Sequence, residues 1–349
     1  MNARTLTLSD NAVRVMTSLL GSTPGTVQSR IRASGLSDSS YRLAQKRLYD
    51  SELVDDRYLP VPSALGLHRV SFVLMRPFTD RIREISQLIS SEPGAAVVLS
   101  GTQIVLGTVF HASEEGADEL REKLSSGPGG SVLAFLSLDP QEPRVPVYFD
   151  FEGAWAHFVG IKGTVHYPRP LPMGPGPSRW GRGASLVGSS ASLQLLRRPF
   201  PEFNGGRPSH LVGPATLPGS QRRLLVRGLV EWRVMLRPGV VPTCGNRSIT
   251  HLIVTRGTLR DPNGLPALFS DLAGSCRVFP FLVASDGSEV LIGSLGTGFE
   301  AVAQSRRRAV LPVISRHLGN LEVVRESMAS VKTPLWHRYE RLLSGVSPV

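Results

Sequence analysis

The stretch Gly101-Thr102-Gln103-Ile104-Val105-Leu106-Gly107 returns later in the chain as Gly287-Ser288-Glu289-Val290-Leu291-Ile292-Gly293. A second stretch, Leu53-Val54-Asp55-Asp56-Arg57, returns as Leu229-Val230-Glu231-Trp232-Arg233, in the same order along the chain. Chance similarity rarely keeps both order and spacing over such a distance. The repeats therefore predict two copies of one module joined in tandem.

Composition and charge favour a folded protein with an anionic partner. The 349 residues exceed the usual length of one domain, and a hydrophobic content of 41% is sufficient for packed cores. The net charge is +11, and only four of the 39 basic residues are lysines. Such an arginine excess favours nucleic acid as the partner, although a biased genome composition produces the same excess.

The motifs of common enzymes are absent from the sequence. No dinucleotide-binding or P-loop glycine pattern occurs, and Ser100 lacks the flanking residues of a nucleophile elbow. Cys244 and Cys276 have no neighbouring Cys or His cluster, so neither a zinc site nor another cofactor is predicted. We therefore expect a protein that is not an enzyme. The polar N-terminus and the lack of a long apolar run predict a cytoplasmic location.

The first 60 residues show the outline of a winged helix-turn-helix. Three helices are expected: the first follows an N-cap at Ser9, and the third runs from Ser37 or Asp38 to about Ser51. Residues 53–59 predict a small wing. On the third helix we expect base-edge contacts from Ser39, Ser40, Arg42 and Leu43, and phosphate contacts from Lys46 and Arg47.

From His68 onward the pattern changes to β-α-β-β-α-β, the order of a ferredoxin-like sandwich. The predicted fold class is therefore α+β: a winged helix-turn-helix plus a ferredoxin-like βαββαβ sandwich, duplicated in tandem. The expected divisions are a first head, a first sandwich, a Pro/Gly-rich linker, a degenerate second head and a second sandwich, at residues 1–62, 63–165, 166–190, 191–242 and 243–349.

The second copy differs from the first in its head. Pro214 and Pro218 shorten the helix that would match the first copy's third helix, so groove insertion by the second head is doubtful. In the second sandwich, a helix is expected over residues 299–318 and a last strand ends near Lys332. Because each sandwich leaves one sheet face open, we expect the sister sheets to cover each other as an intrachain pseudo-dimer, with further homo-oligomers on top.

Together these residues resemble the Lrp/AsnC, or feast/famine, family of transcription regulators. The resemblance is carried by Gly35-Leu36-Ser37, Lys46-Arg47-Leu48, Leu53-Val54, Ala64-Leu65-Gly66 and the closing Ala329-Ser330-Val331-Lys332. It implies a regulator of double-stranded DNA with a head and an effector-responsive sandwich.

The family resemblance also implies a small-molecule effector, such as an amino acid, at the turn between the second and third strands of each sandwich. The corresponding positions are Gly101 and Thr102 in the first copy and Gly287 and Ser288 in the second. A tight turn with a left-handed glycine explains the same residues without any ligand.

Two alternatives stay open. Siroheme decarboxylases have a similar layout, but their His- and Arg-rich tract at the first strand is represented here only by His68 and Arg69, with Arg247 and His251 in the second copy. A sensor or scaffold that kept the fold and lost DNA binding is the other. The prolines of the second head favour it, whereas Arg42, Lys46 and Arg47 count against it.

Overall fold

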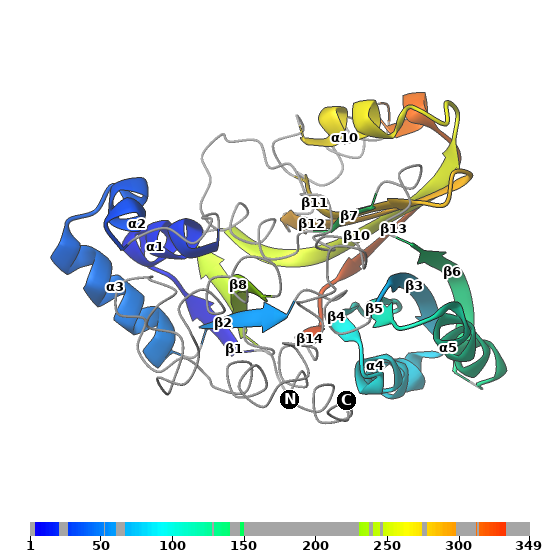
Figure 1. Ribbon diagram of the computed structural model, residues 1–349, viewed down its shortest axis with the longest axis horizontal. Coiled ribbons are helices and arrows are strands. Elements are labelled where there is room, and N and C mark those ends of the chain that lie inside the picture. The colour runs from blue at the N-terminus through cyan, green and yellow to red at the C-terminus, as the bar shows by residue number, and fades with distance from the viewer. Residues whose placement is uncertain are drawn as a thin grey trace, which may run out of the picture.

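The computed structural model describes two large β-sheets with helices on their outer sides, a two-stranded sheet and a three-helix head (Figure 1). The described residues are 4–20, 27–51, 53–60, 67–127, 129–139, 147–149, 230–236, 240–244, 247–273, 278–297, 312 and 314–332. The predicted linker at 166–190, most of the second head and the C-terminal tail lie outside these residues.

The head consists of α1 (Asp10–Leu20), α2 (Val27–Ser34) and α3 (Asp38–Asp50). Ser9 begins α1 as predicted, since its hydroxyl accepts a hydrogen bond from the Ala12 N–H at 3.3 Å. The apolar stripe of α1, with Val15, Met16 and Leu19 fully buried, forms the centre of this small core. The helical periodicity of the sequence therefore predicted the head correctly.

The wing differs from the prediction. Instead of a hairpin within residues 53–59, a single strand β2 (Val54–Pro60) pairs antiparallel with β8 (Val230–Leu236) of the second copy. Arg57 lies opposite Arg233, and these two residues are equivalent in the sequence repeat. The pair of strands is therefore related by a local twofold axis, as at the interface of a symmetric dimer.

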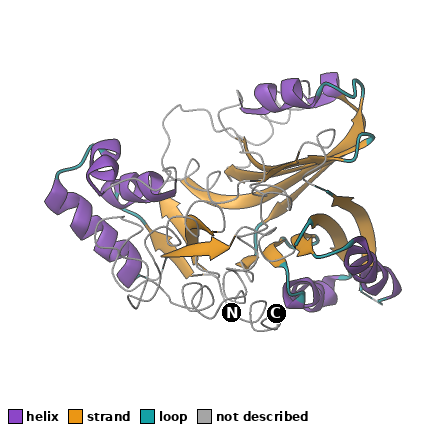
Figure 2. Cartoon of the chain, viewed as in Figure 1, coloured by secondary structure: helices purple, strands orange, loops and turns teal. Residues whose placement is uncertain are grey.

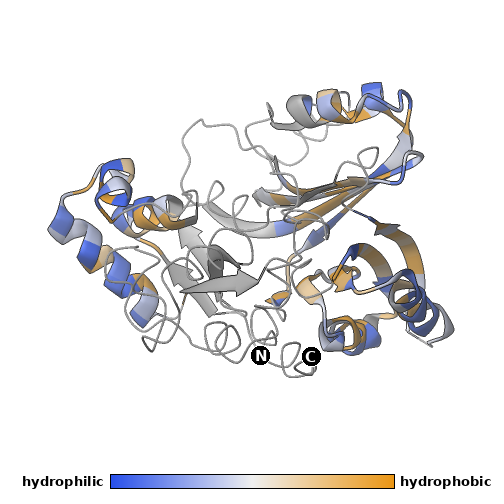
Figure 3. Ribbon diagram, viewed as in Figure 1, coloured by the Kyte–Doolittle hydropathy of each residue, from blue (hydrophilic) through white to orange (hydrophobic). Residues whose placement is uncertain are grey.

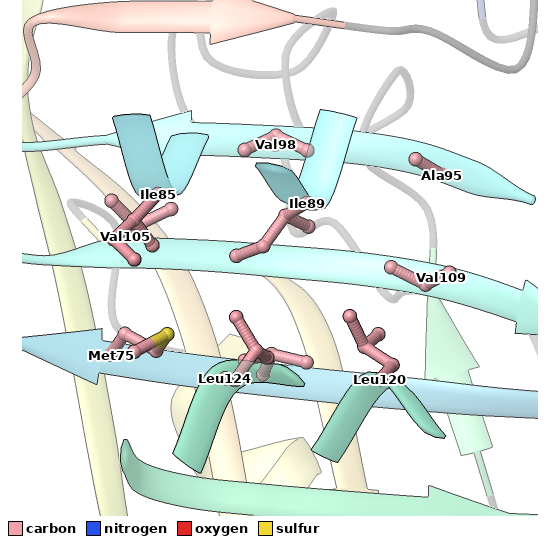
Figure 4. Packing of buried hydrophobic residues seen from close by; sticks show 10 residues of the cluster. Met75, Ile85, Ile89, Ala95, Val98, Val105, Val109, Leu120 and Leu124 are labelled. Atoms are coloured by element: carbon pink, nitrogen blue, oxygen red, sulfur yellow. The ribbon is translucent and has the colours of Figure 1, made fainter. Parts of the chain in front are cut away.

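The first sheet has five strands in the order β14-β4-β5-β3-β6. Helices α4 (Ile82–Ser91) and α5 (Glu114–Ser126) lie on one of its faces (Figures 1 and 2). Figure 4 shows how Ile85 and Ile89 of α4 and Leu120 and Leu124 of α5 pack onto the central strands. The strand bounds are Arg69–Pro77 for β3, Ala95–Ser100 for β4, Val105–His111 for β5, Gly130–Leu138 for β6 and Ser330–Lys332 for β14.

The second sheet repeats this order as β7-β11-β12-β10-β13, with β9 and β1 continuing from the start of β10. Helix α10 (Leu265–Ala273) packs on its outer face through Leu265 and Leu268. The strand bounds are Arg4–Thr7 for β1, Val147–Phe149 for β7, Val240–Cys244 for β9, Arg247–Leu259 for β10, Val278–Ser285 for β11, Glu289–Thr297 for β12 and Leu318–Ser327 for β13.

One expectation for the second sandwich needs correction. A helix was expected over residues 299–318, and one last strand was expected to end near Lys332. Residues 314–317 are helical, in agreement with the expected end of the helix, but a long strand that was not expected, β13, begins at Leu318 and precedes the last strand β14. Sequence periodicity missed β13 because polar residues interrupt its apolar ones, and pairing along β10 determines its conformation.

The two copies exchange their terminal strands. β14 follows the second sandwich in sequence but pairs with β4 of the first, where Val331 lies opposite Leu99. Conversely, β7 follows the first sandwich and pairs with β11 of the second, where Tyr148 lies opposite Val283. Each sheet is therefore completed by a strand from the other copy.

The inner faces of the two sheets meet between α10 on one side and α4 with α5 on the other (Figure 1). A Cβ placed on Gly293 of β12 would lie 3.2 Å from Leu106 Cδ2 of β5, so the strands approach closely here. Figure 3 shows apolar strands in these layers and more hydrophilic residues on the helices.

The sequence repeat in the central strands is offset by one residue from the structural repeat. Gly107 faces α4, since a Cβ there would lie 2.7 Å from Ile89, whereas its sequence counterpart Gly293 faces the other sheet. Val290 and Ile292, not Leu291, take the places of Val105 and Gly107 beneath the outer helices. A shift of one residue exchanges the two faces of a strand.

The predicted fold class, α+β with a ferredoxin-like sandwich duplicated in tandem, is confirmed by this arrangement. The first head has the three predicted helices but not the predicted local wing. Within the described part of the chain, every helix falls short of the length and apolarity needed to cross a membrane.

Candidate nucleic-acid interface

Helix α3 is positioned by a tight turn and by a buried face. Gly35, between α2 and α3, has φ +66°, a left-handed conformation that glycine adopts without strain. Its N–H donates to the Arg32 carbonyl at 3.1 Å, which ends α2 and redirects the chain. Tyr41, Ala44 and Leu48 then bury one side of α3 in the head. The opposite side is left facing away from this core.

All six residues predicted to contact DNA lie on α3 outside its buried face. Ser40 is half-buried and the other five are exposed: Ser39, Arg42, Leu43, Lys46 and Arg47. Their spacing follows from the helical period, because residues three and four apart share a surface. The structure therefore brings the predicted residues together on one helix, which the head presents in the blue, left-hand part of Figure 1.

The two serines take part in capping the helix. Ser37 is the N-cap and accepts a hydrogen bond from the Ser40 N–H at 3.3 Å. Its hydroxyl also donates to Ser40 Oγ at 3.0 Å and lies 3.3 Å from Ser39 Oγ. Ser39 and Ser40 are therefore held in place before any ligand arrives, and their hydroxyls keep a second interaction for a partner.

Arg42 is held by a residue that was not predicted as part of the site. Its Nε donates to Asp38 Oδ2 at 2.8 Å, one helical turn away. This hydrogen bond, together with the negative charge of Asp38, raises the pKa of Arg42 above its ordinary value. Because both side chains are about half-exposed or more, the pair adds little stability and mainly orients the guanidinium.

The remaining residues of this surface are one apolar side chain and two cations. Leu43 is 54% exposed and lies one turn beyond Ser39. Lys46 and Arg47 follow it by three and four residues, and neither forms an ion pair within the described part of the chain. The part of the second head in which matching residues would lie falls outside the described residues.

The predicted effector turn of the first copy lies at the contact between the copies. Gly101 does not have the left-handed conformation expected for it, and its N–H donates to the Ile104 carbonyl at 2.8 Å. A glycine is needed at this position because β13 approaches closely: a Cβ on residue 101 would lie 2.6 Å from Glu326 Cβ. The Thr102 hydroxyl donates to the Glu326 carboxylate.

The predicted effector turn of the second copy is different. Gly287 has φ +97°, and a Cβ there would meet nothing within 4 Å. Its N–H donates to Ser285 Oγ at 3.1 Å, while Asp286 accepts from the N–H groups of Ser288 and Glu289. The amides that were expected to receive an effector carboxylate are thus already bonded, and the effector site stays a prediction.

The first strand brings His68 and Arg69 beside a residue that sequence spacing could not reveal. Arg69 lies opposite His111 on the neighbouring strand, and the His68 N–H donates to the His111 carbonyl at 2.9 Å. Burial, helped by the positive charges of Arg69 and Lys123, lowers the pKa of His111 to about 4. Its Nε2 has no hydrogen-bond partner among the described residues. Arg69 itself pairs with Glu114 at 3.4 Å.

A search of the described residues for groups of three or more His, Cys, Asp or Glu that could hold a metal ion finds none.

Comparison with known proteins gives similarity of fold only. No protein-family model and no curated protein sequence matches the chain. Two solved structures of the siroheme decarboxylase NirDL, one of them in complex with an iron-uroporphyrin III analogue, cover 95–96% of this chain and 99% of their own. Both are 10% identical to it, with a TM-score of 0.47.

A transcriptional regulator from Neisseria meningitidis, solved with L-Met, covers 38% of this chain and 88% of its own, at 17% identity and a TM-score of 0.28. These likenesses are too distant to assign an activity. One expectation is nevertheless contradicted, because two solved structures that match nearly the whole chain are those of an enzyme. The expectation that the protein is not an enzyme is therefore withdrawn.

Proposed function

We propose that this protein is a sequence-specific DNA-binding transcription regulator whose reading surface is the exposed side of α3. The observation that carries the proposal is the α3 surface itself: capped serines, an oriented arginine, an exposed leucine and two cations on a helix whose opposite side is buried. A helix of this kind, third in a three-helix head, fits the major groove of DNA. The net charge of +11 also favours DNA as the partner, because a positive protein attracts the phosphate backbone.

Two groups of residues on this surface have different roles in DNA binding. Ser39, Ser40 and Arg42 near the start of α3 read base edges, since the first turns of such a helix enter the groove. Lys46 and Arg47 near its end neutralise phosphates. The strand exchange between the sandwiches supports an intrachain pseudo-dimer, so one chain offers one described reading head on a scaffold that resembles two subunits.

The test is selection of bound genomic DNA fragments by the purified full chain, followed by affinity measurements over a range of salt concentrations. We expect one enriched sequence, and an affinity that falls steeply with salt because bound cations release counterions. Arg42→Ala with Lys46→Ala should abolish the enrichment.

The matched control removes one arginine and one lysine elsewhere, as Arg83→Ala with Lys123→Ala, and should retain the enrichment. Equal binding by the two double variants would show that α3 is not the reader.

A second candidate function is tetrapyrrole chemistry like that of siroheme decarboxylases. The specific observation in its favour is the grouping of His68, Arg69 and His111 at the ends of two neighbouring strands. Titration of the full chain with an iron porphyrin tests this function directly. A Soret shift that saturates at one equivalent and is lost in His68→Ala supports it, and an unchanged spectrum contradicts it.

A further inference from the structure

Leu43 is the one large apolar side chain of the α3 surface. Among the residues whose side-chain exposure the structure describes, three large hydrophobic residues are exposed: Leu43, Phe78 and Val323. Its neighbours on the helix surface, three and four residues away on either side, are Ser39, Ser40, Lys46 and Arg47. An apolar group is therefore placed at the centre of a polar and basic surface.

We infer that Leu43 recognises a 5-methyl group of a pyrimidine in the major groove; the inference rests on the proposed DNA-binding function. The major groove offers hydrogen-bonding groups at every base pair, but its characteristic apolar group is the methyl of thymine. A leucine cannot donate or accept a hydrogen bond, so it discriminates among bases only through such a contact. The same methyl occurs in 5-methylcytosine, which is the second source of this chemistry.

The surrounding residues keep Leu43 available for this contact. Ser39 and Ser40 are held by Ser37, and Arg42 is drawn back toward Asp38, one turn before it. The side chains that could cover the leucine on the N-terminal side are thereby engaged elsewhere. Lys46 and Arg47 on its C-terminal side can extend to phosphates while their stems flank it.

The experiment uses the duplex that the full chain selects. Each thymine is replaced in turn by deoxyuridine, which removes only the methyl, and the affinity of wild type is compared with that of Leu43→Ala. We expect one or two positions at which wild type loses about fourfold, the factor for burying one methyl-sized group. Leu43→Ala should bind equally well with or without the methyl at those positions. Phe78→Ala, which removes an exposed apolar residue outside α3, should behave as wild type.

The two sources of the methyl are separated by a second set of duplexes in which cytosines are replaced by 5-methylcytosine. Tighter binding of wild type, but not of Leu43→Ala, to a methylated position identifies 5-methylcytosine as the ligand. DNA binding that is indifferent to every methyl, or a methyl dependence that survives in Leu43→Ala, would overturn the inference while leaving the DNA-binding proposal standing. Absence of any selected DNA would overturn both.

Discussion

Gly101→Ala should destabilise the contact between the two copies by a mechanism that one further residue can reverse. The added Cβ would lie 2.6 Å from Glu326 Cβ and 3.2 Å from Glu326 Cγ, but 3.4 Å from Ile104 Cγ1. Only the last distance is an ordinary contact, so the turn or β13 has to move. Overpacking of this kind costs about 1–3 kcal/mol of the free energy of unfolding.

The assay is a double-mutant cycle read by urea unfolding of the full chain. Glu326→Ala and Glu326→Gly both remove the carboxylate that binds Thr102, and they differ only in the Cβ. Gly101→Ala should therefore remain costly in the Glu326→Ala background and become nearly neutral in the Glu326→Gly background. The expected difference is about 1–3 kcal/mol, within the range of couplings between residues in contact. An equal cost in the two backgrounds would refute the close-approach explanation of Gly101.

Three further outcomes test other parts of the structure. His111 has a pKa of about 4 in the folded chain and near 6.5 when unfolded, so the unfolded chain takes up the proton first. The neutral His111 therefore contributes at most about 3 kcal/mol to the free energy of unfolding above pH 6.5, and this contribution is lost as the pH falls toward 4. The urea midpoint of His111→Gln should lack this pH-dependent loss, whereas the midpoint of the control His68→Gln should keep it. Asp38→Asn should release Arg42 and remove a negative charge from the α3 surface, giving tighter DNA binding in a titration; weaker binding would mean that orientation of Arg42 by Asp38 matters more. Gly116→Ala in α5 would place its Cβ no closer than 3.7 Å to His111. Thermal unfolding should therefore show a stability gain of about 0.4–1 kcal/mol, because alanine restricts the unfolded chain. A loss of stability would indicate that the new Cβ clashes with His111.

The sequence predicted the elements whose signals are local. Helix α3 has an N-cap at Ser37, a glycine before it and apolar residues at helical spacing, and these interactions lie within a few residues of each other. The Asp38–Arg42 pair was also within reach, because an acid four residues before an arginine on a helix is a known stabilising arrangement.

The elements that were missed depend on contacts between distant segments. The partner of β2 is β8, and nothing in residues 53–60 distinguishes a local hairpin from a strand that pairs with the other copy. Glu326 reaches Thr102, and His111 reaches Arg69, only because the sheets bring together strands that are distant in the sequence. The glycine repeat predicted the duplication correctly but not the face of each strand, because a shift of one residue leaves the repeat visible and exchanges the faces.

The exchange of terminal strands implies that a substitution in the second copy can open the first. Val331 in β14 is buried and lies opposite Leu99 of β4, and the Ala329 N–H donates to the Ser100 carbonyl at 2.8 Å. Val331→Asp would remove about 1.5–3 kcal/mol of apolar burial and place a charge without a partner at the sheet.

We therefore expect β14 to detach and the amides of residues 98–100 that face it to exchange with solvent faster, while those bonded to β5 keep their protection. The matched control is Ser330→Asp, which introduces the same group at the preceding, half-buried position and should leave the exchange in β4 nearly unchanged. Hydrogen exchange measured residue by residue distinguishes the two variants. Unchanged protection in β4 of Val331→Asp would mean that the first sheet does not depend on the strand from the second copy. Fast exchange at β4, with its edge left open to other chains, would show that the first sheet needs the strand from the second copy to protect this edge.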